Sequence, residues 1–346
     1  MRAVIFEDIG KVRLATVKDP TLEAPTDALI KIRLAGICGS DLHPFHGRER
    51  GIDSGCVMGH EAVADVIAVG SAVTTLKVGD RVYVPFTTSC GHCAYCRMGL
   101  TCRCELDQLF GWVAGGRGLS GLQAELARVP MADATLVAVP ESVGDIEALL
   151  LGDVMATGFF AADLAAVSPE GTYAVVGCGP IGLMAICGAR ERGAKHIFAL
   201  DFAPERRAMA ASFGAIPVDP MKEDAAGLIS QVAGRGADAV MECVGSEAAA
   251  RLAYDLVRPG GTLAVVGVHT AGFAFSPAEA YDKNLSYRTG RCPARAYAAK
   301  LLPLVAAERY PIAKVVSHTL ALHEGARGYQ IFDLKQDGCT KVVLRP

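Results

Sequence analysis

The sequence predicts an α/β protein with two domains, a β-rich lobe followed by a doubly wound parallel sheet. The chain has 346 residues, which is more than one hydrophobic core usually serves. Short strand patterns separated by Gly, Pro and Asp fill roughly the first 150 residues. After about residue 170, strand and helix patterns alternate, which is typical of a parallel sheet covered by helices. These observations place the change of architecture near the middle of the chain.

Composition narrows the possible functions. Hydrophobic residues make up 51% of the chain and glycines number 38, which indicates a globular enzyme and not a disordered chain. The net charge of -3 gives no basic excess for nucleic acid or an anionic membrane. We find neither a secretory signal nor an apolar run near the ~20 residues that cross a bilayer. Five of the twelve cysteines have metal-ligand spacing, so we expect reduced thiols and a cytoplasmic protein.

The strand patterns of the first lobe are short and separated by turns. We expect strands at 28–34, 61–70 and 78–84, and their turns favour a compact barrel-like lobe over βαβ units. The later alternating part has helical patterns at 181–190 and after Pro204, which stands where a helix tolerates proline. Strands are expected there at 173–176, 196–201, 216–218, 237–242 and 262–267. The resulting domains are 1–154 and 155–290, and 291–346 returns to the first lobe.

A glycine-rich turn predicts the nucleotide site. Residues 177–182 read Gly-Cys-Gly-Pro-Ile-Gly and lie between a predicted strand and a predicted helix, where the dinucleotide fingerprint requires them. Gly177, Gly179 and Gly182 allow a tight turn and let pyrophosphate approach the helix N-terminus. Asp201 follows Gly182 by 19 residues, close to the expected ~20. Its carboxylate suits an adenosine ribose and would repel a 2′-phosphate, which favours NAD over NADP.

Two arginines leave an alternative for the cofactor. Arg206 and Arg207 could reach a 2′-phosphate, or they could form a solvated helix face. The glycine turn itself could serve only to pack a structural domain.

A cysteine-rich loop predicts a structural zinc site. Cys90, Cys93 and Cys96 are followed by Cys102 and Cys104. Four thiolates in one short loop complete a closed tetrahedral zinc shell that performs no chemistry. Spacing alone does not decide between Cys102 and Cys104 as the fourth ligand. A cluster of reduced cysteines without metal is the alternative.

The stretch from Cys38 to Glu61 carries groups for a second zinc. Cys38 supplies a thiolate, His60 an imidazole and Glu61 a carboxylate, and Ser40 has a hydroxyl two residues after Cys38. These are zinc ligand types with a nearby group that can handle a proton. Cys38 and His60 are too far apart for a short finger, so another ligand must come from elsewhere in the chain.

Together these motifs resemble the zinc-containing alcohol dehydrogenases of the medium-chain dehydrogenase/reductase superfamily over essentially the whole chain. The resemblance rests on the Cys38 to His43 segment, Gly59-His60-Glu61, the cysteine loop, the glycine turn and Asp201. It implies a Rossmann NAD-binding domain and a GroES-like catalytic domain. It also implies two zinc ions per chain, one catalytic and one structural, with Cys104 as the fourth structural ligand.

The last catalytic ligand departs from the classical members, which have a cysteine before a Thr-Gly pair. Residues 152–158 instead resemble bacterial secondary-alcohol dehydrogenases, with Asp153 in the ligand place. The resemblance therefore implies Cys38, His60 and Asp153 as ligands, with Glu61 as an alternating ligand or a group behind the metal. Asp153 as a helix N-cap and Glu61 as a structural carboxylate near Arg or Lys are the alternatives.

The resemblance also assigns roles around the metal. Ser40 takes the proton of the alcohol, and His43 passes it to solvent, with His46 as the alternative for this step. Asp41 orients His60, and Thr157 packs behind the nicotinamide. Further cofactor contacts are expected from Pro180, Ile181, Arg206, Val244, Gly267 and Val268.

The substrate is expected to be a small secondary or primary alcohol. Loops that line the cleft in this family supply Phe45, Leu109, Phe110 and Trp112, whose apolar character suits such substrates better than polyols. Trp112 could instead fill the core, and Cys292 is expected to be a buried structural thiol. Alternatives are a polyol, sugar, threonine or formaldehyde dehydrogenase, or a catalytically silent sensor. The family assembles through its nucleotide domains, which implies a homotetramer or a dimer.

Overall fold

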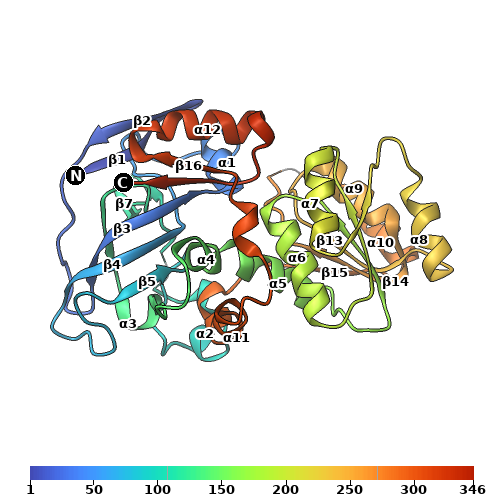
Figure 1. Cartoon of the computed structure of the whole chain (residues 1–346), viewed down its shortest axis with the longest axis horizontal. Helices are drawn as coiled ribbons and strands as arrows, with labels where there is room; N and C mark the ends of the chain where they lie inside the picture. Colours follow the sequence, from blue (N-terminus) through green and yellow to red (C-terminus); the bar gives the residue numbers. More distant parts are fainter. Residues whose placement is uncertain (107, 271) are drawn as a thin grey trace. The chain divides into compact units, whose positions relative to one another are not determined.

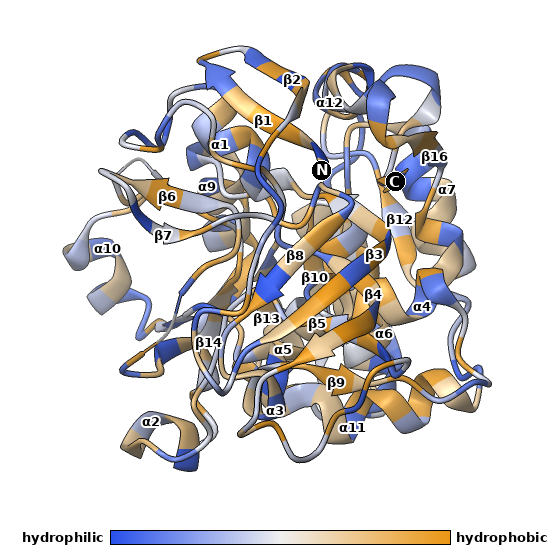
Figure 2. Ribbon diagram, turned by 90° about the vertical axis from the view of Figure 1, so that its left-hand side faces the viewer, coloured by the Kyte–Doolittle hydropathy of each residue, from blue (hydrophilic) through white to orange (hydrophobic). Residues whose placement is uncertain are grey.

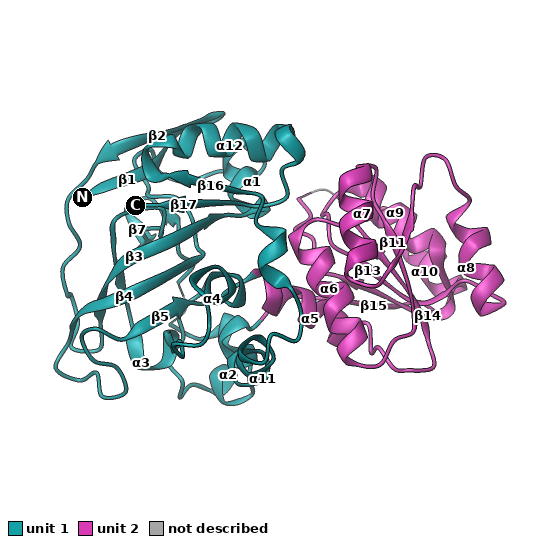
Figure 3. Cartoon of the chain, in the orientation of Figure 1, with its two compact units in different colours: residues 1–153, 293–346 teal, residues 154–292 magenta. Residues whose placement is uncertain are grey.

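The computed structural model describes residues 1–106, 108–270 and 272–346 (Figure 1). The chain forms two compact units, shown in Figure 3. Unit 1 contains Met1–Asp153 and Pro293–Pro346, and unit 2 contains Val154–Cys292. The sequence places the boundaries after residues 154 and 290, whereas the chain leaves unit 1 after residue 153 and returns after residue 292. The C-terminal segment therefore shares a unit with the N-terminal lobe.

Unit 1 is built on a seven-stranded sheet in the order β16-β17-β3-β4-β5-β9, with β8 also paired to β3. Its strands are β3 (Ala28–Ile37), β4 (Ala62–Val69), β5 (Arg81–Val84), β8 (Leu126–Val129), β9 (Val137–Ala138), β16 (His318–Ala321) and β17 (Val342–Arg345). The predicted alternation is present in β3, where Ile30 and Ile32 are buried while Lys31 and Arg33 are not. Hydrophobic colouring dominates the strands of this sheet in Figure 2.

Smaller elements surround this sheet. Two hairpins join β1 (Arg2–Asp8) to β2 (Lys11–Thr16) and β6 (Trp112–Ala114) to β7 (Arg117–Leu119). The α-helices of unit 1 are α1 (Leu42–Phe45), α2 (Ala94–Arg97), α3 (Ala132–Thr135), α4 (Asp145–Leu151), α11 (Ala294–Ala306) and α12 (Gly325–Leu334). The 3₁₀ helices are η1 (Gly39–Asp41), η2 (Thr101–Arg103), η3 (Ile312–Val315), η4 (Leu322–Glu324) and η5 (Gln336–Gly338).

Unit 2 contains the predicted doubly wound parallel sheet, in the order β12-β11-β10-β13-β14-β15. Its strands are β10 (Thr172–Val176), β11 (His196–Leu200), β12 (Ile216–Val218), β13 (Ala237–Glu242), β14 (Val257–Val265) and β15 (Ser286–Thr289). Its helices are α5 (Val154–Leu164), α6 (Pro180–Glu191), α7 (Pro204–Ser212), α8 (Ala225–Ala233), α9 (Glu247–Leu256) and α10 (Pro277–Asp282). Across the described part of the chain, no helix has both the length and the apolar character of a membrane span.

The chain end returns to the middle of the unit 1 sheet and brings a lysine with it. β17 pairs antiparallel with β3, so that Val342 lies opposite Ile37. Just before β17, Lys341 Nζ donates to Glu61 Oε1 at 2.7 Å. The two side chains are 1% and 0% exposed. Gly36 makes room for this pair, since a Cβ there would lie 2.0 Å from Glu61 Oε2.

Replacement of Lys341 by methionine should strongly destabilise unit 1. Glu61 would keep its burial and lose its cation, a change that typically costs about 3–5 kcal/mol. The free energy of unfolding from urea denaturation measures the loss. The double variant Glu61→Met/Lys341→Met removes both charges and should recover most of it. A Lys341→Met protein as stable as the wild type would show that the pair does not support the fold.

Candidate metal and nucleotide sites

A buried cluster of four potential ligands lies at the ends of β3 and β4. Cys38 follows β3 directly, and His60 and Glu61 precede β4. The antiparallel ladder continues here, because Gly36 N donates to Glu61 O at 2.9 Å. Asp153 joins the group from the end of α4. One ligand atom from each of the four residues lies within 4.8 Å of all the others.

The distances within the cluster identify which atoms converge. Asp153 Oδ2 lies 3.4 Å from Cys38 Sγ and 3.3 Å from His60 Nε2. The exposed fractions are 6%, 7% and 7% for Cys38, His60 and Asp153. Burial, reinforced by the negative charges of Asp153 and Glu61, raises the pKa of the Cys38 thiol. A buried thiol and two carboxylates around an imidazole fit a divalent cation, and sulfur, nitrogen and oxygen together are zinc ligands.

Asp41 holds the imidazole from behind. Its Oδ1 lies 3.2 Å from His60 Nδ1, which leaves Nε2 on the side of Cys38 and Asp153. Burial opposes a charge on His60, but the charge of Asp41 and hydrogen bonds to Asp153, Asp41 and Cys38 raise its pKa well above the ordinary value. Asp41 therefore fixes both the ring orientation and the nitrogen offered to a metal.

The candidate proton-transfer residues lie on η1 and α1. Ser40 Oγ is 3.2 Å from His60 Nε2, which places a hydroxyl beside the convergent ligand atoms. His43 is buried, with 8% exposure, so it is not a surface histidine. His46 is 2.8 Å from Asp333 on α12.

The residues expected to line a substrate pocket have different surroundings. Phe110 is 1% exposed and belongs to the hydrophobic core of the main sheet of unit 1. Trp112 is half-buried in β6, opposite Leu119. Phe45 is half-buried against the ring of Tyr329, with 5.6 Å between ring centroids.

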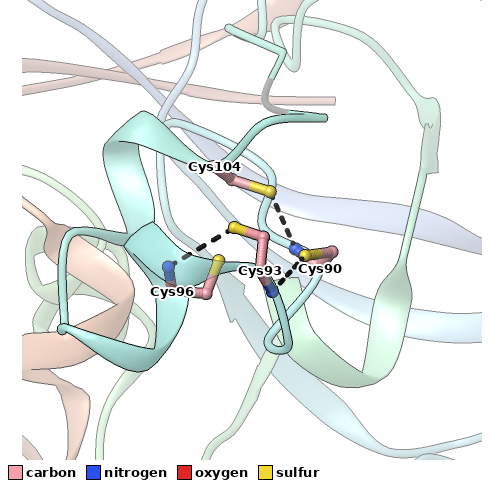
Figure 4. A group of neighbouring side chains, drawn as sticks. All are labelled: Cys90, Cys93, Cys96 and Cys104. Carbon is pink, nitrogen blue, oxygen red and sulfur yellow. Dashed lines mark hydrogen bonds between the residues drawn. The ribbon is translucent and has the colours of Figure 1, made fainter.

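The four-cysteine loop is arranged for a closed metal site. The sulfurs of Cys90, Cys93, Cys96 and Cys104 point toward one another (Figure 4) and lie within 4.8 Å of one another. Backbone N–H groups donate to three of them, from Cys90 to Cys104 at 3.2 Å, from Cys93 to Cys90 at 3.3 Å and from Cys96 to Cys93 at 3.5 Å. The bond from the Cys96 N–H leads the causes that lower the pKa of the Cys93 thiol to about 6. Burial instead raises the pKa of the Cys96 and Cys104 thiols. The convergence of the four sulfurs is therefore the feature that fits Zn²⁺.

Cys104 and not Cys102 completes this group of sulfurs. Cys102 is buried in η2 with 1% exposure. His92 is exposed, and its Nδ1 lies 2.9 Å from Cys90 O.

The glycine turn connects β10 to α6 with the geometry that a dinucleotide needs. Gly177 has φ +92°, a value that side chains disfavour. At Gly182 a Cβ would lie 1.8 Å from Gly177 O, so only glycine allows the close packing of helix and strand. Gly179 is the N-cap of α6, and Pro180 and Ile181 begin its first turn. Among the described residues, only Arg206 Nη1, at 3.8 Å, comes within 4 Å of a Cβ built at Gly179, which leaves space for a ligand on this turn.

Asp201 lies at the end of β11 and already accepts two backbone hydrogen bonds. Its Oδ2 accepts from Cys178 N and its Oδ1 from Ala203 N, both at 2.9 Å. Arg206 Nη1 is 3.9 Å from Asp201 Oδ2. Arg207 is held by Asp219 at 3.0 Å and by the carbonyl groups of residues 201 and 202. Of the two arginines, Arg206 therefore lies beside the glycine turn, whereas the guanidinium of Arg207 is bound to other groups of unit 2.

The remaining expected cofactor residues belong to unit 2. Val244 is 50% exposed, and its Cγ2 would lie 2.4 Å from a Cβ at Gly177. Gly267 leaves no space for a side chain, since a Cβ would lie 2.2 Å from Gly245 N. Val268 is 42% exposed and Thr157 is buried in α5.

Several residues at these sites escaped the sequence analysis. Lys341 could have been noticed as a charge adjoining the apolar run 342–344. Glu242, at the end of β13, accepts from Val244 N and Gly245 N at 2.8 Å each and lies 3.0 Å from His269 Nε2. No spacing pattern marks Glu242 or His269, because the two side chains come from separate segments of the chain. Gln123 and Tyr329, which lie behind Asp41, were missed for the same reason.

Comparison with known proteins finds relatives over nearly the whole chain. Family models match residues 24–141 as an alcohol dehydrogenase GroES-like domain and residues 180–307 as a zinc-binding dehydrogenase. The chain is 39% identical to zinc-type alcohol dehydrogenase B of Aspergillus flavus, covering 96% of this chain and 79% of that protein. It is 40% identical to alcohol dehydrogenase TADH from Thermus sp. ATN1, with a TM-score of 0.92 over 100% of this chain and 99% of that one.

A third relative has its cofactor bound. An alcohol dehydrogenase from Escherichia coli, solved with NADH, is 25% identical, with a TM-score of 0.86 over 100% of this chain and 99% of that one. The predicted fold of a GroES-like domain plus a Rossmann domain is confirmed. The protein is an enzyme, a zinc-dependent alcohol oxidoreductase with a nicotinamide cofactor. The chain belongs to the zinc-containing alcohol dehydrogenases of the medium-chain dehydrogenase/reductase superfamily.

Proposed function

We propose that this enzyme oxidises small secondary or primary alcohols with NAD, reversibly, at a zinc held by Cys38, His60 and Asp153. The observation that carries the proposal is the convergence of these three side chains in one buried cluster. The Ser40 hydroxyl, 3.2 Å from His60 Nε2, lies beside them. Glu61 is a conditional ligand, since Lys341 already binds its carboxylate. Cys90, Cys93, Cys96 and Cys104 would hold the structural zinc.

Different residues of this chain have different roles in the proposed reaction. When bound, zinc supplies a Lewis acid that lowers the pKa of the alcohol, and NAD accepts the hydride, leaving a ketone or aldehyde. Ser40 accepts the hydroxyl proton, and His43 carries the proton onward toward solvent. Asp41 keeps the His60 imidazole aimed at the metal. Burial of the ligands keeps bulk water from their polar atoms.

The cofactor site is proposed to prefer NAD. The pyrophosphate would bind the glycine turn at the N-terminus of α6, with Val244, Gly267, Val268 and Thr157 around the rest of the cofactor. Asp201 would accept hydrogen bonds from the adenosine ribose, and its negative charge would repel a 2′-phosphate. Arg206, the arginine beside the turn, would face the adenosine end.

The apolar character of Phe45, Leu109 and Trp112 supports small alcohols over polyols. The ring of Phe86 adds an apolar neighbour to His60, with 6.3 Å between ring centroids. All twelve cysteines are free thiols, which supports a reducing, cytoplasmic location.

Replacement of Ser40 by alanine tests the proposed reaction. Turnover of small alcohols should fall by about 10²–10⁴-fold, the usual contribution of a positioned proton acceptor, while the zinc content stays at two per chain. Initial rates with secondary and primary alcohols, sorbitol, threonine and formaldehyde, each with NAD and NADP, measure it. Ser54→Ala, which removes a hydroxyl bonded to Glu7 O, is the matched control. Turnover of polyols alone would refute the substrate class, and no turnover of any alcohol would refute the reaction.

Replacement of Asp201 by asparagine tests the cofactor preference. Asparagine keeps an acceptor for the N–H of Cys178 and removes the charge that repels a 2′-phosphate. We expect the ratio of kcat/KM with NADP to that with NAD to rise by about tenfold, equivalent to ~1.4 kcal/mol. Asp201→Ser should act in the same direction. An unchanged ratio in both variants would remove Asp201 as the selecting residue.

The enzyme is also proposed to form a homo-oligomer, with a tetramer favoured, through unit 2. β15 ends the described sheet, and all four of its residues are exposed. Phe273 beside it is 72% exposed and packs edge-on against Tyr287, with 5.4 Å between ring centroids. An open sheet edge of this kind usually needs cover. Sedimentation equilibrium should give an assembly in which Tyr287→Asp weakens association, and a wild-type monomer would contradict this proposal.

A further inference from the structure

A buried chain of hydrogen bonds continues behind Asp41 to the C-terminal helix. Asp41 Oδ2 accepts from Cys38 N at 2.9 Å and from Gln123 Nε2 at 3.2 Å. Gln123 Oε1 in turn accepts from the Tyr329 hydroxyl at 3.1 Å. The chain therefore runs from Tyr329 on α12 through Gln123 to Asp41, and through Asp41 Oδ1 to His60.

These links are sealed from solvent. Gln123 and Tyr329 are each 0% exposed, and Asp41 is 5% exposed. Water therefore cannot easily replace a lost partner, so removal of one side chain leaves buried polar atoms unpaired.

The partners of Gln123 fix the orientation of its amide. Nε2 faces two acceptors, Gly36 O at 3.0 Å and Asp41 Oδ2 at 3.2 Å. A flipped amide would place Oε1 against both of them and lose these bonds. The Tyr329 hydroxyl supplies the donor that the correctly oriented Oε1 needs. Tyr329 thus selects the amide orientation that directs a donor at Asp41.

The backbone next to His60 also holds Gln123 in place. Gly59 has φ +88°, and a Cβ there would lie 2.4 Å from Gln123 Cγ. Gln123 N donates to Met58 O at 2.9 Å. The side chain therefore packs directly against the segment that carries His60.

We propose that Gln123 and Tyr329 are positioning residues for the catalytic metal. Tyr329 fixes the Gln123 amide, Gln123 fixes Asp41, and Asp41 holds His60 with Nε2 directed at the ligand cluster. This inference rests on the proposed ligand set of Cys38, His60 and Asp153. It gives α12 a part in metal binding although none of its side chains belongs to the ligand cluster.

Zinc affinity of the catalytic site tests the chain of contacts. Gln123→Met keeps an unbranched side chain and removes the amide. We expect it to weaken zinc binding about tenfold, which is the lower end of the loss in metal affinity seen when a residue that orients a ligand is replaced. Tyr329→Phe keeps the ring and removes the hydroxyl. It should weaken zinc binding by about threefold, which corresponds to the free energy of one lost hydrogen bond. Competition with a chromophoric chelator measures both values. The four-cysteine zinc should keep its affinity in each variant.

Two further measurements separate positioning from general structural support. If Tyr329 acts through Gln123, Tyr329→Phe should add almost nothing in a Gln123→Met background. Cobalt substituted at the catalytic site should show shifted visible bands in the Tyr329→Phe protein, since the geometry at His60 changes. Tyr83→Phe is the control, because its hydroxyl is buried without a hydrogen bond among the described residues, and it should change neither reading.

Asp41→Asn separates a failure of the proposed ligand geometry from a failure of the positioning role of Gln123 and Tyr329. Unchanged catalytic zinc affinity in this variant would refute the ligand geometry itself. Weakened affinity in Asp41→Asn, with Tyr329→Phe and Gln123→Met at the wild-type value, would overturn only the positioning role. If Gln123→Met does not fold, Tyr329→Phe decides alone, and unchanged affinity and cobalt bands would overturn the inference.

Discussion

The pairing of β3 with both β4 and β17 is the constraint on which the metal cluster depends. One neighbour brings Glu61 opposite Gly36, and the other brings Val342 opposite Ile37. Cys38 therefore emerges from a strand whose two sides are fixed by segments far apart in the sequence. A slip of one residue in either ladder would turn every side chain of that strand to the opposite face.

Charge explains why this arrangement needs both a lysine and a metal. Glu61 is completely buried, and its carboxylate is neutralised by the equally buried Lys341. Cys38 and Asp153 remain, and a divalent ion suits the negative charge that they carry when ionised. Lys341 thus makes it possible to place a third acidic group within the cluster, which explains why Glu61 can be both a structural partner and a conditional ligand.

The sequence revealed the parts of the sites whose residues are close together in the chain. The residues of the cysteine loop and of the glycine turn each lie within a short stretch of sequence, so their spacing alone predicts that they come together. Asp153 required a family resemblance, because it reaches the cluster from the end of α4. Gln123 gave no pattern, and Lys341 stood out only as a charge beside an apolar run, since the partners of both side chains lie far away in the sequence. β15 was missed because its four exposed residues lack the apolar alternation of a half-buried strand.

The three missed residues of unit 1 have a common physical role. Lys341, Gln123 and Tyr329 are nearly or fully buried polar side chains whose partners lie in other segments of unit 1. A buried polar atom is costly unless it is paired, so each of them demands one particular arrangement of its neighbours. The apolar core would tolerate small shifts of β3 against α12, whereas these hydrogen bonds would not. The orientation of His60 is thus determined by the same contacts that attach the end of the chain to the catalytic lobe.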